Sequence, residues 1–308
     1  MSEKIVILGV FVADTTYRAA RQPRMGETIL GDGFALGPGG KGSNQAVAAA
    51  MAGGDVHFLT RLGRDPFADM ALATWKRAGV TPAVSWHDDG YTGAACIHVD
   101  SASGDNAIII CPGVGGSISP ADIEAHGGLI GEAGVFVTQL EQPMDAAQRA
   151  LELARAGGAT TVLNPAPAVS LAEGMLALCD YATPNETEAE ALTGIRVAGI
   201  DDASRAAAAL RRLGAGAALI TLGENGVLYH GAEGAVHVPA LDAGPVVETT
   251  GAGDAFNGGF AAALARGTPP LEAVRFGCAT AAISVTRAGT APSMPARAEI
   301  EALLAATA

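Results

Sequence analysis

The chain has 308 residues, of which 49% are hydrophobic and 17% are charged, and its formal net charge is −13. This composition excludes an intrinsically disordered protein, and the lack of clustered lysines and arginines argues against nucleic acid or a membrane surface as a partner. The four cysteines lie far apart, which argues against a disulfide framework and a structural zinc site. The short N-terminal apolar run predicts a buried strand rather than a signal peptide, so we expect a cytoplasmic protein without a membrane-spanning segment.

Apolar runs of strand length alternate with longer, alanine-rich segments that have helical spacing. Near-continuous apolar strands separated by helices are typical of a parallel sheet that is covered on both faces. The sequence therefore predicts an α/β fold with a mostly parallel sheet between layers of helices. The expected strands cover residues 4–11, 56–62, 135–140, 160–163 and 218–222, and the expected helices cover residues 44–51, 65–78, 145–156, 203–213, 254–265 and 271–285.

Two acidic residues, Asp14 and Glu141, each follow an expected strand, at the edge of the sheet where ligands of open α/β folds bind. Together they suit a polyhydroxy ligand, although either alone is commonly a solvated loop acid. The segments 15–36 and 94–112 interrupt the alternation of strands and helices with β-branched residues and turn signals. We expect both to form short antiparallel strands that extend from the main sheet as a lid, the alternative being two surface hairpins without a role.

A glycine-rich segment at residues 37–44, GPGGKGSN, precedes an expected helix. It contains the G-x-G-x-x-G spacing, but it does not directly follow the first strand as a dinucleotide-binding loop does. A Walker A loop is excluded because Gly42, rather than Ser or Thr, follows Lys41. The sequence therefore predicts a loop whose backbone, with Lys41 and Asn44, binds a polyhydroxy ligand.

Two further segments follow expected strands. In TPNETEAE, Asn185 and Glu188 have the spacing of a helix capping box, and a functional interpretation places them near nucleotide phosphates and Mg²⁺. In ITLGENG, Thr221 ends an apolar strand before a glycine turn, which is a common junction and also a suitable cradle for a nucleotide.

The segment 246–260, VVETTGAGDAFNGGF, carries the most information. Its glycine turn leads directly into an expected helix, whose N-terminal amides favour a bound anion such as a transferring phosphoryl group. Asp254 lies where it can accept a proton from an attacking hydroxyl group. The alternative is an ordinary helix-capping aspartate.

Together these segments resemble the ribokinase/phosphofructokinase-B family of ATP-dependent sugar kinases, and most of all its ribokinase branch. The resemblance covers nearly the whole chain, and the motifs come in the order typical of the family. They are the early Asp14, GGKGSN at 39–44, QLE at 139–141, LNPAPA at 163–168, TPNETEAE at 183–190, ITLGENG at 220–226, TTGAGDAFNGGF at 249–260 and SVTRAGTAPSMP at 284–295.

The resemblance implies one ribokinase-like domain over residues 1–308, with a Rossmann-like sheet and a β lid through which a homodimer forms. It also implies transfer of a phosphoryl group from ATP to a hydroxymethyl group of a pentose or related sugar. The implied catalytic base is Asp254, with an anion hole at Gly251, Ala252 and Gly253. The implied sugar-binding residues are Asp14, Gly40, Lys41, Asn44 and Glu141. The implied ATP-binding residues are Asn185, Thr221, Gly223, Gly226 and Cys278, and Glu188 organises Mg²⁺. The implied site for a monovalent cation such as K⁺ comprises Glu248, Thr250, Ser284, Arg287, Gly289 and Ser293.

The sequence departs from the family's pattern at two positions. Ribokinases usually have Asn two residues before the sugar-binding aspartate, whereas this chain has Val12. Loss of that hydrogen bond costs about 1–3 kcal/mol, so Val12 favours a deoxy or otherwise altered sugar. Glu248 replaces a common Asp beside the cation, which predicts weakened or lost activation by K⁺. The alternatives are a nucleoside kinase, whose base would fill the apolar space at Val12, and a sugar-binding regulator without catalysis.

Overall fold

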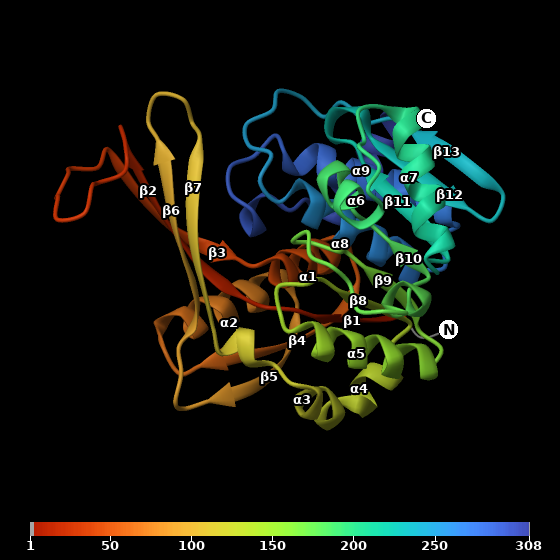
Figure 1. Ribbon diagram of the computed structural model, residues 1–308, viewed down its shortest axis with the longest axis horizontal. Helices are drawn as coiled ribbons and strands as arrows, with labels where there is room; N and C mark the ends of the chain where they lie inside the picture. Colours follow the sequence, from red (N-terminus) through yellow and green to blue (C-terminus); the bar gives the residue numbers. More distant parts are fainter. Residues whose placement is uncertain (1–2, 308) are drawn as a thin grey trace.

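The computed structural model describes residues 3–307, and its centre is a nine-stranded sheet (Figure 1). In spatial order, the strands from β11 (Ala217–Thr221) to β5 (Thr81–His87) pair in parallel, and a hairpin of β12 (Val227–Gly231) and β13 (Gly234–Val238) is added antiparallel at one edge. In spatial order they are β13 (Gly234–Val238), β12 (Val227–Gly231), β11 (Ala217–Thr221), β10 (Tyr181–Ala182), β9 (Thr160–Leu163), β8 (Val135–Thr138), β1 (Lys4–Leu8), β4 (Asp55–Gly63) and β5 (Thr81–His87).

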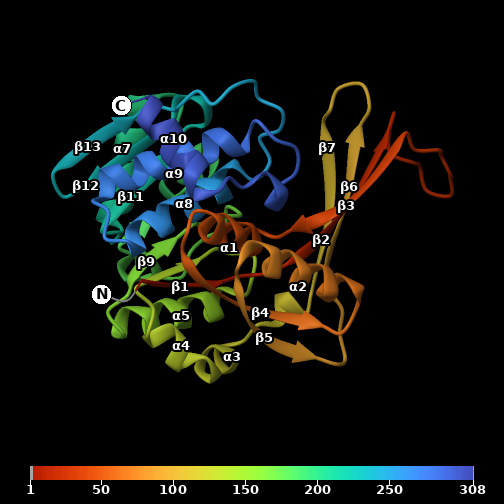
Figure 2. The same cartoon turned by 180° about the vertical axis from the view of Figure 1, so that it is seen from behind.

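Helices cover both faces of this sheet because its strands are apolar on both sides. On β1, Ile5 and Ile7 belong to one buried cluster, while Val6 and Leu8 belong to another on the opposite face. The first cluster packs under helices seen in front in Figure 2: α1 (Lys41–Met51), α2 (Pro66–Ala78), α8 (Ala252–Ala265), α9 (Pro270–Ser284) and α10 (Arg297–Ala306). The second packs under α3 (Pro120–Ala125), α4 (Gly127–Gly131), α5 (Met144–Ala156), α6 (Glu186–Thr193) and α7 (Ile200–Arg212).

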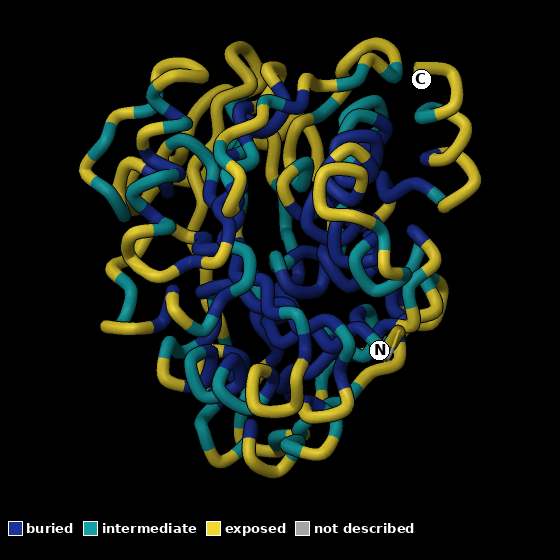
Figure 3. The backbone as a smooth tube through the Cα atoms, turned by 90° about the vertical axis from the view of Figure 1, so that its right-hand side faces the viewer, coloured by how far each residue is buried: buried dark blue, intermediate teal, exposed yellow. Residues whose placement is uncertain are grey.

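The buried segments form a continuous interior, with exposed segments around it (Figure 3). Short 3₁₀ helices connect some of the elements, namely η1 (Val114–Ser117), η2 (Met175–Leu178), η3 (Gly223–Asn225) and η4 (Ala291–Ser293). Among residues 3–307, none of the helices combines the length and the apolar character that crossing a membrane requires.

The expected α/β fold is confirmed, and the predicted strands and helices lie at the expected positions with ends that differ by a few residues. Helix α1, for example, begins at Lys41 rather than at residue 44. Its first turn passes so close to the end of β1 that a Cβ on Gly42 would lie 2.7 Å from the Cα atom of Gly9. Three strands of the main sheet, β5, β12 and β13, were not predicted from the sequence. Strand β5 lies at the edge of the sheet, is mostly half-exposed and lacks a continuous apolar run.

The two segments that interrupt the alternation form a separate four-stranded sheet, which projects from the body of the molecule (Figures 1 and 2). Its strands, in spatial order, are β3 (Gly33–Gly39), β2 (Val12–Ala19), β6 (Thr92–Asp100) and β7 (Asn106–Gly113). Each hairpin is antiparallel, as expected, but β2 and β6 pair in parallel. The prediction of antiparallel strands is confirmed within each segment, and no pairing between the two segments was predicted. Strands β2 and β6 pair in parallel because both leave the carboxyl-terminal edge of the main sheet and run outward together.

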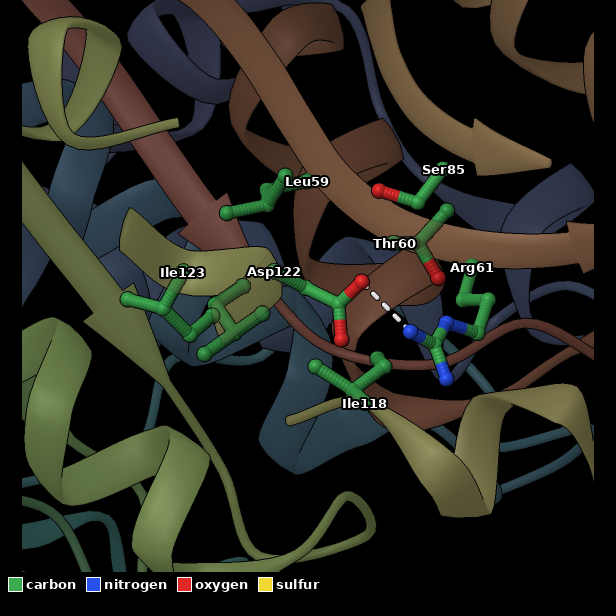
Figure 4. A pocket seen from close by; sticks show the side chains of 8 residues that line it. Leu59, Thr60, Arg61, Ser85, Ile118, Asp122 and Ile123 are labelled. Atoms are coloured by element: carbon green, nitrogen blue, oxygen red, sulfur yellow. Dashed lines mark hydrogen bonds and ion pairs between the residues drawn. The ribbon is translucent and has the colours of Figure 1, made fainter. Parts of the chain in front are cut away.

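A partly buried ion pair joins the main sheet to the chain that follows β7 (Figure 4). Arg61 of β4 is 9% exposed, donates to the carbonyl and hydroxyl oxygens of Ser117 at 2.5 and 2.9 Å, and pairs with Asp122 of α3. The pair lines a cavity of about 10 Å³, which is large enough for about one water molecule. At the start of β6, the amide of Thr92 donates to Asp65 at 2.7 Å. The Thr92 contact thus fixes the start of β6, whereas the contacts of Arg61 hold the segment that follows β7.

Candidate active site

A cavity of about 150 Å³ lies at the carboxyl-terminal ends of β9, β10 and β11. The N-terminal turns of α1, α6 and α8 form most of the rest of its wall. Ligands of open α/β sheets bind at this edge. The lining residues are Lys41, Asn164, Ala166, Thr183, Asn185, Glu188, Thr221, Gly251, Gly253, Asp254 and Asn257.

Asp254 lies in the first turn of α8, directly after the glycine turn. Gly251 caps the helix with φ = 83°, a left-handed conformation that glycine adopts without strain. The Asp254 carboxylate is 7% exposed and accepts hydrogen bonds from the side-chain amides of Asn44 at 3.1 Å and Gln45 at 3.0 Å. Burial raises its pKa, although Lys41 and these two amides oppose the shift. A raised pKa brings the carboxylate closer to working pH and makes it a better base.

The amides at the start of α8 differ in their availability. The Ala252 N–H group donates to the carbonyl oxygen of Thr249 at 3.1 Å. Gly253 lines the cavity, as Gly251 does, whereas Ala252 lies outside the set of lining residues. An anion in the cavity would therefore meet the amides of Gly253 and Asp254, because N–H groups of the first turn lack acceptors within the helix.

Lys41, the first residue of α1, brings a positive charge into this acidic cavity. Burial lowers its pKa, but the carboxylates of Asp254, Glu141 and Glu188 raise it more, so the net shift is upward. Lys41 therefore remains an ammonium group and partly balances the surrounding negative charge.

The predicted sugar-binding residues meet beside this cavity. The backbone amide of Lys41 donates to the Glu141 carboxylate at 2.7 Å, and burial raises the pKa of Glu141 to about 7. Burial also raises the pKa of Asp14 to about 6. Gly40, with φ = 87°, caps α1 next to the buried Asn44. The structure thus gathers these five residues around the start of α1.

Val12 lies on the same face of β2 as Asp14, two residues before it. It is buried and pairs with Gly39 of β3 and Gly93 of β6. A Cβ on Gly39 would lie 2.1 Å from a carboxylate oxygen of Asp14, so the Asp14 side chain rests directly over this glycine. Val12 therefore presents an apolar surface next to a carboxylate suited to hydroxyl groups.

The predicted nucleotide residues are brought together in part. Asn185 and Thr221 form a parallel bridge, and both line the cavity. Asn185 and Glu188 form the reciprocal contacts of a capping box, at 2.8 and 2.9 Å. Gly223 and Gly226 lie on the adjacent turn between β11 and β12, with φ of 54° and 86°.

Cys278 lies elsewhere, on α9, and is not among the residues that line the cavity. Its thiol is buried, which raises the pKa of Cys278 to about 12. The thiol is therefore uncharged at neutral pH and acts as an apolar surface.

The predicted cation-binding residues lie on two segments, 248–250 and 284–293, which contact each other next to the start of α8. Glu248 accepts a hydrogen bond from the Gly289 amide at 2.8 Å and donates its own amide to Val285 at 3.1 Å. Ser293 donates to the carbonyl oxygen of Thr290 at 2.7 Å. The other members, Thr250, Ser284 and Arg287, lie on the same two segments, and the Arg287 side chain pairs with Glu299.

The donor set of the cavity suits Mg²⁺ bound together with a phosphate-bearing ligand. In the described part of the chain, no group of three or more His, Cys, Asp and Glu side chains could hold a metal ion by itself. Mg²⁺ usually takes only one or two protein carboxylates, and phosphate oxygens and waters complete its shell. Glu188 supplies one carboxylate, of which one oxygen accepts from the Asn185 amide.

The sequence analysis missed three polar residues of the cavity wall: Asn164, Thr183 and Asn257. Asn164 donates to the carbonyl oxygen of Thr183 at 2.9 Å, Thr183 donates to Asn257 at 2.6 Å, and Asn257 donates to the carbonyl oxygen of Gly253 at 2.8 Å. Asn164 and Thr183 directly follow β9 and β10, at the carboxyl-terminal edge of the sheet. The rule that selected Asp14, a polar residue just after a strand, would therefore also have selected them.

A mostly parallel α/β sheet with a glycine turn, a helix start and a buried carboxylate at its carboxyl edge fits a phosphoryl-transfer enzyme. The comparison with protein families agrees, because residues 2–297 match the model of the pfkB family carbohydrate kinases. The chain belongs to this family.

Relatives and solved structures match the chain along almost its full length. It is 36% identical to the ribokinase of Haemophilus influenzae, with 97% of each chain covered. It is also 36% identical to the deoxyribokinase of Salmonella typhimurium, with 94% of this chain and 95% of that chain covered. Among solved structures, Arabidopsis thaliana ribokinase complexed with ribose and ATP superposes with a TM-score of 0.92, at 30% identity and 99% coverage of both chains.

Proposed function

We propose that the protein transfers the γ-phosphoryl group of ATP to a hydroxymethyl group of a pentose. The observation that carries this proposal is the position of Asp254, buried in the first turn of α8 between a glycine turn and the carboxylates that surround Lys41. The family and the similarity to ribokinases support the same reaction.

In the proposed mechanism, Asp14, Asn44 and Glu141 bind sugar hydroxyl groups and direct the hydroxymethyl oxygen toward Asp254. Asp254 accepts the hydroxyl proton as this oxygen bonds to the γ-phosphorus, the bond to the β–γ bridging oxygen breaks, and ADP leaves. The amides at the start of α8 and the Lys41 ammonium stabilise the negative charge on the transferring group. Asn185, Thr221, Gly223 and Gly226 are proposed to bind the nucleotide, with Cys278 as an apolar neighbour.

Glu188 would hold Mg²⁺, which when bound neutralises charge on the ATP phosphates. The residues proposed for K⁺ lie behind α8, where Glu248 already accepts from the Gly289 amide. Because one oxygen of this longer carboxylate is engaged within the protein, we propose that K⁺ activates the enzyme weakly or not at all.

We propose that Val12 determines which sugar the enzyme prefers as its substrate. Among relatives at 36% identity, one is named for ribose and another for deoxyribose. An apolar side chain next to Asp14 leaves a hydroxyl group without a partner, which costs about 1–3 kcal/mol. We therefore propose a pentose with one hydroxyl group fewer than ribose, such as 2-deoxyribose, as the preferred substrate. The relatives are named for sugar kinases, so a nucleoside kinase and a non-catalytic regulator are not favoured.

We further propose that the chain works as one α/β domain, that the four-stranded sheet closes over the sugar as a lid, and that two lids pair in a homodimer. Exposed apolar side chains on this sheet, among them Tyr17, Phe34 and Ile109, support the pairing. A substrate pair of ATP and a free sugar supports a cytoplasmic location.

The test is ADP release with Mg·ATP and a panel of ribose, 2-deoxyribose, hexoses and nucleosides, with and without K⁺. We expect turnover of pentoses, a higher kcat/KM for 2-deoxyribose than for ribose, and a reversed preference in Val12→Asn. Turnover of nucleosides alone, or ATP binding without turnover of any acceptor, would contradict the proposal.

A further inference from the structure

Gln45 is fully buried on α1, directly after the predicted sugar ligand Asn44. Its side-chain nitrogen donates to Asp254 Oδ1 at 3.0 Å and to Asn164 Oδ1 at 3.1 Å. Its side-chain oxygen accepts from Nε2 of Gln139 at 2.5 Å. Both ends of the Gln45 amide therefore form hydrogen bonds. The family motif GGKGSN ends at Asn44, so the resemblance implies no role for Gln45.

The contact with Gln139 fixes which end of the Gln45 amide faces Asp254. A carboxylate can only accept hydrogen bonds, so Asp254 requires the nitrogen end. Gln139 donates to the oxygen end from the opposite side, and the orientation in which Gln45 donates to Asp254 is the one that satisfies both neighbours. If the Gln45 amide were flipped, its oxygen would face the carboxylate of Asp254 and its nitrogen would face the Gln139 nitrogen. Both contacts would be repulsive, which is costly in a buried site.

The two oxygens of Asp254 are thereby distinguished. Oδ1 is held from the protein interior by Gln45, whereas Oδ2 accepts from Asn44, which belongs to the proposed sugar site. Because Asn44 contacts Oδ2, this oxygen lies on the side of the proposed sugar site. A carboxylate held at Oδ1 keeps Oδ2 aimed at the cavity before the substrate arrives, and such positioning accounts for a large part of catalysis in phosphoryl transfer.

We infer that Gln45 is a positioning residue, which holds Oδ1 of Asp254 so that Oδ2 accepts the proton of the sugar hydroxyl. This inference rests on the proposed kinase activity. The other charged groups that act on Asp254 are Lys41 on α1, Glu188 on α6 and Glu141 after β8, with Asp14 of β2 acting on Glu141.

The test compares Gln45→Glu with Gln45→Leu in the full-length protein and measures kcat and both KM values between pH 5.5 and 9. In Gln45→Glu the shape is retained, but an acceptor and a negative charge replace the donor beside Oδ1. We expect kcat to fall about 10²-fold in both variants, with KM for ATP unchanged. In Gln45→Glu alone, the acid limb of the kcat profile should move up by about one pH unit, because a like charge raises the pKa of Asp254.

Gln142 provides the matched control, since it is also a buried glutamine of this region. It donates to Thr138 at 2.8 Å and to the carbonyl oxygen of Gln139 at 2.6 Å, without touching Asp254. Gln142→Glu should leave the acid limb of the kcat profile in place. A folded Gln45→Glu variant with wild-type kcat and an unmoved pH profile would overturn the inference while leaving the kinase activity intact. A wild-type protein without kinase activity would instead overturn the proposed function.

Discussion

The edge of the nine-stranded sheet and the projecting four-stranded sheet differ in which side chains they bury and which they expose. Around the cavity, buried polar groups such as Asp254 and Asn164 have partners within the chain. On β7, by contrast, Ile108, Ile109 and Ile110 are 51%, 69% and 55% exposed. Exposed apolar side chains in a row are unfavourable unless another surface covers them. Asp254 and Asn164 are thus paired within the chain, although the side-chain oxygens of Asn44 and Gln139 have no partner among residues 3–307, whereas β7 leaves apolar side chains exposed.

The strand register separates two apolar surfaces of the projecting sheet. Ile110 lies across from Ala95, which pairs with Asp14, so Ile110 shares the face of the proposed sugar site. Ile109 points to the opposite face, together with Tyr17 and its neighbour Phe34. One face is therefore suited to closing over a substrate, and the other to a second copy of the lid.

The largest expected effect is a loss of stability in the main sheet. Phe136 is fully buried on β8 in the centre of the main sheet, and Phe136→Ala should lower the free energy of unfolding by about 3–5 kcal/mol. Urea denaturation at fixed protein concentration measures this. A loss below about 1 kcal/mol would mean that the central sheet is less tightly packed than the structure indicates.

A smaller effect is expected at the proposed dimer interface on the four-stranded sheet. Ile109→Lys places a charge in the proposed dimer interface and should weaken self-association by about 2 kcal/mol, while the fold is retained. Sedimentation equilibrium measures the change. The control is Ile200→Lys, because Ile200 is 42% exposed on α7, away from the lid. Equal association of both variants and the wild type would exclude this face as the interface.

The smallest of the three effects concerns pH. Burial raises the pKa of Glu141 from 4.5 to about 7, so its carboxylate ionises late. Its contribution to folding stability is present below pH 4.5 and is lost as pH rises through about 7. Binding of the sugar has the opposite dependence, since the ionised carboxylate accepts its hydroxyl groups. Affinity for the sugar should therefore rise about tenfold from pH 6 to pH 8.

Calorimetric titration of the sugar at several pH values measures this dependence. Glu141→Gln should bind more weakly at pH 8 and show a flatter profile. If the affinity of the wild-type protein is constant between pH 6 and pH 8, the ionised Glu141 carboxylate does not contribute to sugar binding.

The sequence was sufficient for features that depend on neighbouring residues. The capping box of Asn185 and Glu188 and the glycine turn before Asp254 are local, and the structure contains both. The helices and strands of the main sheet likewise follow from runs of apolar residues.

Contacts between distant segments could not be predicted in this way. Gln45 meets Gln139 and Asp254 across separations of 94 and 209 residues, and nothing in the spacing of these side chains announces the contact. The parallel pairing of β2 with β6 is similar, because each hairpin by itself predicts only its own antiparallel register. These features depend on how the main sheet brings its strand ends together.

The most direct test of the central claim is a single-turnover experiment with Mg·ATP and 2-deoxyribose, followed by ³¹P NMR of the product. The account predicts that the wild-type protein forms a phosphate ester at the sugar hydroxymethyl group. Asp254→Asn should bind both substrates and transfer the phosphoryl group about 10³-fold more slowly. Transfer at the wild-type rate by Asp254→Asn, or release of inorganic phosphate in place of a sugar ester by the wild type, would contradict it.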